Sequence, residues 1–238
     1  MERDRLCVDE GGASFRPLDS ARVEASVSER IKRVVDPYDP NSLAGKARAR
    51  RFAFFRGLLD QVPKPCRVLD VGGAPPTWRE IPDGVEVTLL NTTPVDEGPE
   101  MPTLVADACD MPFEAGEYDV IFSNSVIEHV GDQEAMAEEI RRVGQRYFVQ
   151  TPNYYFPIEP HALFPAFQYL PLEMRATLLT RFELGHPGRI SDRDEARRWA
   201  SEIRLLKAKD MRRLFPDAQL HRERFLGLTK SLMVYRWT

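Results

Sequence analysis

The sequence has few of the features that mark specialised classes of protein. It contains only three cysteines, Cys7, Cys66 and Cys109, and their positions lack the short spacings of a metal site or a disulfide framework. We therefore expect free thiols, a reducing compartment and no bound metal.

Long apolar runs and an excess of positive charge are also missing. No apolar stretch approaches the roughly 20 residues of a membrane-spanning helix, and the first twelve residues, MERDRLCVDEGG, lack the apolar region of a signal peptide. The net charge of −4 argues against a broad nucleic-acid surface. These absences predict a cytoplasmic protein with no membrane span and no nucleic-acid partner.

Short apolar runs instead alternate with helical patterns, which predicts an α/β fold with a parallel sheet and helices on both faces. The predicted strands are residues 67–71, 85–91, 103–106, 118–123, 146–150, 219–224 and 231–237, the last of them antiparallel. The predicted helices are residues 19–35, 43–61, a stunted 77–81, 132–143, 172–182 and 209–215. Asn41 or Ser42 can cap the second helix.

This pattern divides the chain into four parts. Residues 1–41 form an N-terminal arm and helix, and residues 42–153 form a nucleotide-binding core. Residues 154–200 interrupt the strand–helix alternation with aromatic residues and prolines, which indicates an inserted lid for substrate binding. Residues 201–238 complete the core.

The glycine turn in CRVLDVGGAPP, residues 66–76, is the centre of this organisation. The buried strand carries Asp70 near its end, and Gly72 and Gly73 then allow the backbone to turn sharply against a ligand. A carboxylate at this turn would repel the pyrophosphate of a dinucleotide. It suits S-adenosylmethionine (SAM), which has no phosphate but carries a sulfonium and an ammonium group.

This acid and the glycine turn resemble motif I of class I SAM-dependent methyltransferases, although Ala74 and Pro76 stand where the family commonly has further glycines. A second stretch, VADACDMPFEAGEYDVIFSNSVIEHV (residues 105–130), is similar to the adenine-binding and fourth-strand segment of that family. The resemblance, to the type 11-like branch, implies a Rossmann-like fold with a seven-stranded, mostly parallel sheet. It also implies SAM as the cofactor.

The resemblance further implies a set of cofactor-binding residues. These are Asp70, Gly72, Gly73, Asn91, Asp107, Ala108, Met111, Ser123 and Asn124. Asn91 is neutral where the family usually has an acid for the ribose hydroxyls. Together with Ala74 and Pro76, it leaves open a non-catalytic SAM-fold protein that serves as a binding partner or regulator.

A third stretch, TPNYYFPIEPHALFPAFQYLP (residues 151–171), follows the fifth strand and resembles the P-N-x-x-F-P-I-E-P-H stretch of a bacterial branch of these methyltransferases. We expect Tyr154, Tyr155 and Phe156 to bind a substrate. His161 is a candidate general base, with Glu159 as its orienting group, and His129 is the alternative base. Both histidines could instead have only structural roles.

The resulting hypothesis is a SAM-dependent O-methyltransferase with a histidine base. Its acceptor would be a small hydroxylated molecule such as a sugar, a glycan or a secondary metabolite. N- or C-methylation of a small metabolite is the alternative activity.

Overall fold

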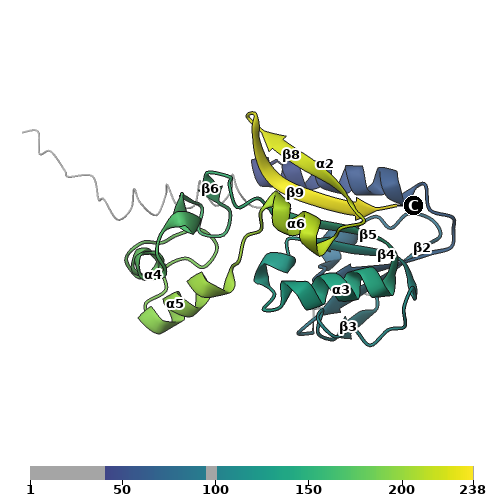
Figure 1. The fold of residues 1–238 in the computed structure, drawn as a ribbon, viewed down its shortest axis with the longest axis horizontal. Helices are drawn as coiled ribbons and strands as arrows, with labels where there is room; N and C mark the ends of the chain where they lie inside the picture. The colour runs from purple at the N-terminus through teal and green to yellow at the C-terminus, as the bar shows by residue number, and fades with distance from the viewer. Residues whose placement is uncertain (1–40, 95–100, 238) are drawn as a thin grey trace, which may run out of the picture.

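The computed structural model describes residues 41–94 and 101–237 (Figure 1). Its main sheet has seven strands in the order β3-β2-β1-β4-β5-β9-β8, and β9 alone runs antiparallel to the other six. The strands are β1 (Cys66–Val71), β2 (Val85–Asn91), β3 (Thr103–Val105), β4 (Tyr118–Asn124), β5 (Gly144–Pro152), β8 (Gln219–Phe225) and β9 (Leu228–Arg236). The predicted mostly parallel sheet with an antiparallel last strand is therefore confirmed. Cys7 and the predicted helix at residues 19–35 lie outside the described residues.

The centre of the sheet is where a ligand site is expected. β1 pairs with β2 on one side and with β4 on the other, so the chain order reverses between β1 and β4. In open α/β sheets, ligands bind at such a reversal, outside the carboxyl ends of the strands. Val68 and Leu69 are fully buried, one toward each face, because helices cover both sides of this strand.

The helices on the two faces begin at well-formed caps. On one face, α2 (Leu43–Leu59) begins after Ser42, whose hydroxyl accepts from the Gly45 N–H at 2.7 Å, and it buries Phe55 and Leu59. On the other face, α3 (Gln133–Val143) begins after Asp132, and α6 (Ala208–Leu214) packs beside it. The short first helix is confirmed as one 3-10 turn, η1 (Pro75–Trp78).

The chain between β5 and α6 forms a separate small layer beside the sheet, here called the insertion (residues 154–202; Figure 1). Its elements are β6 (Ile158–Glu159), β7 (Phe164–Pro165), η3 (Phe167–Tyr169), α4 (Leu172–Arg181) and α5 (Arg193–Glu202). It has its own apolar cluster, made of Ala162, Phe167, Ala176, Leu179, Ile190, Ala196 and Ala200. The insertion is therefore held together independently of the core under the sheet.

The hairpin of β8 and β9 ends in an exposed apolar turn. Leu226 and Gly227 both have positive φ, as a two-residue hairpin turn of type I′ requires. Leu226 is 87% exposed, and Phe225 and Leu228 flank it. None of the helices in the described part of the chain is long and apolar enough to cross a membrane.

Candidate active site

A cavity of about 470 Å³ opens at the carboxyl ends of β1, β4 and β5. Its volume is in the range of small-molecule sites. The predicted site residues on its wall are Asp70, Gly72, Gly73, Asn124, His129, Phe156 and His161. The structure thus brings the glycine turn, the fourth-strand loop and the stretch after the fifth strand to one place.

The glycine turn is built so closely that side chains are excluded from it. Gly72 has φ +72°, and a Cβ there would lie 2.4 Å from a methyl carbon of Val126. A Cβ on Gly73 would lie 2.3 Å from Oδ2 of Asp70. Bare backbone at these two positions is therefore a steric requirement, and it leaves the main chain open to the cavity.

Asp70 provides a buried carboxyl group on this wall. It is only 2% exposed, and its Oδ2 accepts a hydrogen bond from the Trp78 indole at 2.7 Å. Burial raises the pKa of Asp70 to about 7, although the Trp78 hydrogen bond and the positive charge of Arg48 act in the opposite direction. A cation placed next to Asp70 would favour its ionised form.

The other residues predicted for the cofactor lie away from this cavity or serve the fold. The Asn91 side chain donates to the Gly73 carbonyl at 3.0 Å and thereby holds the turn. The Asp107 carboxylate accepts from the Cys109 N–H within its own turn. Ala108 and Met111 are buried in the core, and the Ser123 hydroxyl donates to the Val71 carbonyl.

A cluster of two histidines and two carboxylates forms where the loop after β4 meets the insertion. Glu128 and His129 end the short helix η2 (Ile127–His129) after β4, and His161 follows β6 in the insertion. The His129 and His161 rings meet edge to face with centroids 4.7 Å apart. Glu159 holds His161 firmly: Oε1 lies 2.6 Å from the ring Nδ1, and Oε2 accepts from the His161 N–H at 2.9 Å.

Burial and mutual charge shift the pKa values in this cluster. Burial raises the pKa of Glu128 to about 7, against the opposing effect of a charged His161. Desolvation, together with the neighbouring His161, lowers the pKa of His129 to about 4. Burial lowers the pKa of His161, but its hydrogen bond to Glu159 and the charges of Glu159 and Glu128 outweigh this, so the net shift is upward. His161 is consequently the more basic of the two histidines.

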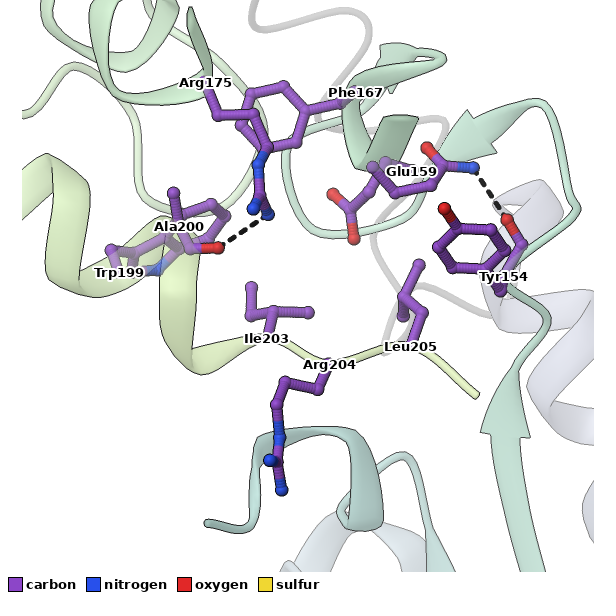
Figure 2. A pocket seen from close by; sticks show the side chains of 10 residues that line it. Tyr154, Glu159, Phe167, Arg175, Trp199, Ala200, Ile203, Arg204 and Leu205 are labelled. Carbon is purple, nitrogen blue, oxygen red and sulfur yellow. Dashed lines mark hydrogen bonds between the residues drawn. The ribbon is translucent and has the colours of Figure 1, made fainter. Parts of the chain in front are cut away.

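Glu159 also borders a second, smaller cavity of about 170 Å³, which is lined by the insertion and by residues 203–205. Figure 2 shows its carboxylate on the same cavity as Arg175, whose guanidinium donates to the Ala200 carbonyl at 2.7 Å. Of the residues predicted to bind substrate, Tyr154 lines this smaller cavity, Phe156 lines the larger one, and Tyr155 is 62% exposed. The three aromatic residues therefore do not share one pocket.

The sequence analysis missed several charged residues of the larger cavity. Arg48 and Arg51 reach it from α2, and Lys230 reaches it from β9. The two arginines are three residues apart on a predicted helix, so a helical plot would have placed them on one face. No sequence signal marks Lys230, because it comes from the far end of the chain.

Comparison with known proteins supports the fold and the cofactor. A family model described as a methyltransferase domain matches residues 85–146, from β2 into β5. The CurJ carbon methyltransferase has 11% identity and a TM-score of 0.53, and the match covers 92% of this chain and 60% of that one. At this identity the likeness shows the fold alone.

Two further solved structures have TM-scores just under 0.5. The 1,6-didemethyltoxoflavin-N1-methyltransferase of Burkholderia thailandensis has 14% identity, coverage of 92% and 90%, and a TM-score of 0.49. A methyltransferase assigned to an antibiotic biosynthesis pathway of Anabaena variabilis has 14% identity and a TM-score of 0.48. The match covers 74% of this chain and spans 64% of the length of the Anabaena protein.

The residues around the glycine turn fit the methionine half of SAM. The turn leaves no room for side chains, and Asp70 is a buried carboxyl group whose ionised form a neighbouring cation would favour. The chain therefore has the Rossmann-like fold of class I methyltransferases, and its methyltransferase-domain segment indicates S-adenosyl-L-methionine as the cofactor.

Proposed function

We propose that this chain is a SAM-dependent methyltransferase that methylates a hydroxyl group of a small acceptor held in the larger cavity. The observation that carries the proposal is His161, which lies on the wall of the cavity that also contains the glycine turn and whose ring Nδ1 is 2.6 Å from Glu159. A hydroxyl acceptor has to lose a proton during transfer, and a histidine with a shifted pKa is the side chain best suited to take it.

The hydrogen bond between Glu159 and His161 defines the direction of proton transfer. Because a carboxylate only accepts hydrogen bonds, it keeps the proton of the neutral imidazole on Nδ1 and leaves the lone pair on Nε2. When bound, SAM supplies a methyl group made electrophilic by its sulfonium. His161 Nε2 would accept the hydroxyl proton as the acceptor oxygen becomes methylated.

The rest of the cavity would bind and orient. Asp70 would stabilise the positive charge of the cofactor, and the glycine turn would admit its methionine end next to the backbone. Phe156 would pack against the acceptor, because it is the predicted substrate residue that lies on the larger cavity. Such placement matters because methyl transfer needs the nucleophile about 3 Å from the methyl carbon, in line with sulfur.

The first test is cofactor binding. We expect micromolar affinity for SAM and for its demethylated product by isothermal titration calorimetry. Gly72→Val should abolish binding, because its side chain would collide with Val126 and project beside the cavity. Gly57→Ala is the matched control, since a Cβ at that helical position meets nothing within 4 Å. No heat with either ligand at millimolar concentration would refute the proposed function.

The second test is the base. In metal-free buffer, with small glycosides and phenols as acceptors, His161→Ala should lower turnover by about 10²–10⁴-fold and leave SAM affinity unchanged. His221→Ala is the control, because His221 stacks on Phe54 and does not line the cavity. Full activity in His161→Ala with a large loss in His129→Ala would move the base to His129. Activity in both would exclude a histidine base.

A further inference from the structure

Glu128 belongs to the cluster with His129 and His161, and within the residues that the structure describes one of its carboxylate oxygens has no hydrogen-bond partner. The residue is fully buried, and its Oε2 accepts from the Thr151 hydroxyl at 2.9 Å. Its Oε1 is buried as well and has no hydrogen-bond partner among the described residues. A buried carboxylate oxygen without a partner is costly, so its position points to a ligand that completes the site.

The two histidines direct nitrogen atoms to the same place. One potential ligand atom from each of Glu128, His129 and His161 lies within 4.8 Å of the other two. His161 uses Nδ1 for Glu159, which leaves Nε2 available. The His129 ring makes no hydrogen bond to another residue in the described part of the chain, and it has an exposed surface.

We propose that Glu128, His129 and His161 bind one divalent transition-metal ion at the edge of the larger cavity. Two imidazole nitrogens and one carboxylate oxygen are a ligand set of catalytic zinc and non-haem iron sites. The carboxylate–histidine pair of Glu159 and His161 is the support that metal-bound histidines usually have. Both histidines line the cavity, so an ion held by them would be accessible from the space where an acceptor would bind.

The geometry requires only a local contraction. Ligand atoms that share a metal at about 2.0–2.2 Å lie about 3–4 Å from one another. The potential ligand atoms now lie within 4.8 Å of one another, so they have to move closer by about an ångström. Rotation of the exposed His129 side chain can supply this movement. Glu128 and His161 are already fixed by Thr151 and Glu159.

This inference deepens the proposed function, because an acceptor hydroxyl could bind the metal in the same cavity. Coordination lowers the pKa of a bound hydroxyl or water. A metal held there would let the proton of a coordinated hydroxyl pass to solvent water, and His161 would then be a ligand; it would act as the base only in the metal-free chain. Metal binding itself requires neither SAM nor an acceptor, so it can be tested even if the proposed function fails.

The experiment is a direct binding measurement on the full chain after removal of metals with a chelator. Titration with Zn²⁺ is followed by calorimetry, and titration with Co²⁺ by visible absorption, which reports the ligand geometry. We expect one ion per chain. His129→Ala, His161→Ala and Glu128→Gln should each weaken binding at least 100-fold, and His221→Ala should leave it unchanged.

Two further results decide the assignment even if a ligand variant folds poorly. Glu159→Gln keeps a hydrogen bond to His161 but removes the charge, so it should weaken binding about 10–100-fold. Absence of stoichiometric Zn²⁺ and Co²⁺ binding by the unaltered chain at micromolar concentration would overturn the proposal. The cluster would then be a hydrogen-bonded group with a protonated Glu128. Metal binding without SAM binding would support this inference and refute the methyltransferase proposal.

Discussion

Replacement of Asp70 by Asn tests the electrostatics of the glycine turn. Burial raises the pKa of Asp70 from 3.8 to about 7 in the folded chain. The folded chain thus holds this proton more tightly than the unfolded chain. The carboxyl group therefore contributes its full stabilisation below pH 3.8 and loses it as the pH rises to about 7. The total difference is about 4 kcal/mol, at about 1.4 kcal/mol per pH unit.

The assay is urea unfolding of the unaltered chain and of Asp70→Asn at pH 5 and pH 8, without cofactor. The free energy of unfolding of the unaltered chain, relative to that of the variant, should fall by about 3 kcal/mol between these pH values. Glu128, whose pKa is also raised, is present in both proteins and cancels. The comparison therefore isolates Asp70.

Glu173→Gln is the matched control for this measurement. Glu173 is an exposed residue paired with Arg193 and Arg197, and its pKa is lowered. Its contribution to the free energy of unfolding is therefore lost only at pH values below 5. The difference in that free energy between the unaltered chain and Glu173→Gln should stay constant between pH 5 and pH 8. If Asp70→Asn also gives a flat difference, the carboxyl group is not protonated in the folded chain and the reasoning is wrong.

The remaining predictions concern cofactor-linked protons and stability. SAM binding should release protons between pH 6 and pH 7, because a cation next to Asp70 favours its ionised form; calorimetry in buffers of different ionisation enthalpy measures this. Thr151→Val should lower the free energy of unfolding by about 1–3 kcal/mol in urea, since it removes the Glu128 hydrogen bond; an unchanged value would contradict that bond. Leu226→Asn should raise stability by about 1 kcal/mol in thermal unfolding by relieving the positive φ, and a loss would mean that the leucine side chain packs. Gly144→Ala should be strongly destabilising by the same assay, because its Cβ would lie 2.5 Å from a neighbouring side chain.

The sheet was predictable because its strands are short apolar runs whose boundaries are marked by local signals. Residues 85–91 form β2 as predicted, the helix after Ser42 starts at one of its two predicted caps, and the helix predicted from residue 132 starts one residue later, with Asp132 as its cap. The error at β9, which begins at Leu228 and not at residue 231, comes from a turn of two positive-φ residues that includes a leucine. Gly227 marks a turn, but leucine rarely adopts this conformation, so the sequence does not show that the turn is made of Leu226 and Gly227.

The candidate site was predictable only in part. Asp70, the two glycines and Asn124 lie on the cavity because local sequence places them at the ends of β1 and β4. Glu128 and His161 come close together only because the insertion folds back against the carboxyl ends of the strands. Spacing along the chain carries no information about that contact, which is why the sequence predicted no metal site.

The insertion's separate apolar cluster has a consequence for thermal inactivation. One member of the histidine cluster, His161, belongs to the insertion, whereas Glu128 and His129 belong to the short helix η2 after the central strand β4. A small layer with its own core can open as a cooperative unit while a larger sheet stays folded. We therefore expect heating to separate His161 from Glu128 and His129 when the insertion opens, before far-ultraviolet circular dichroism registers loss of the sheet.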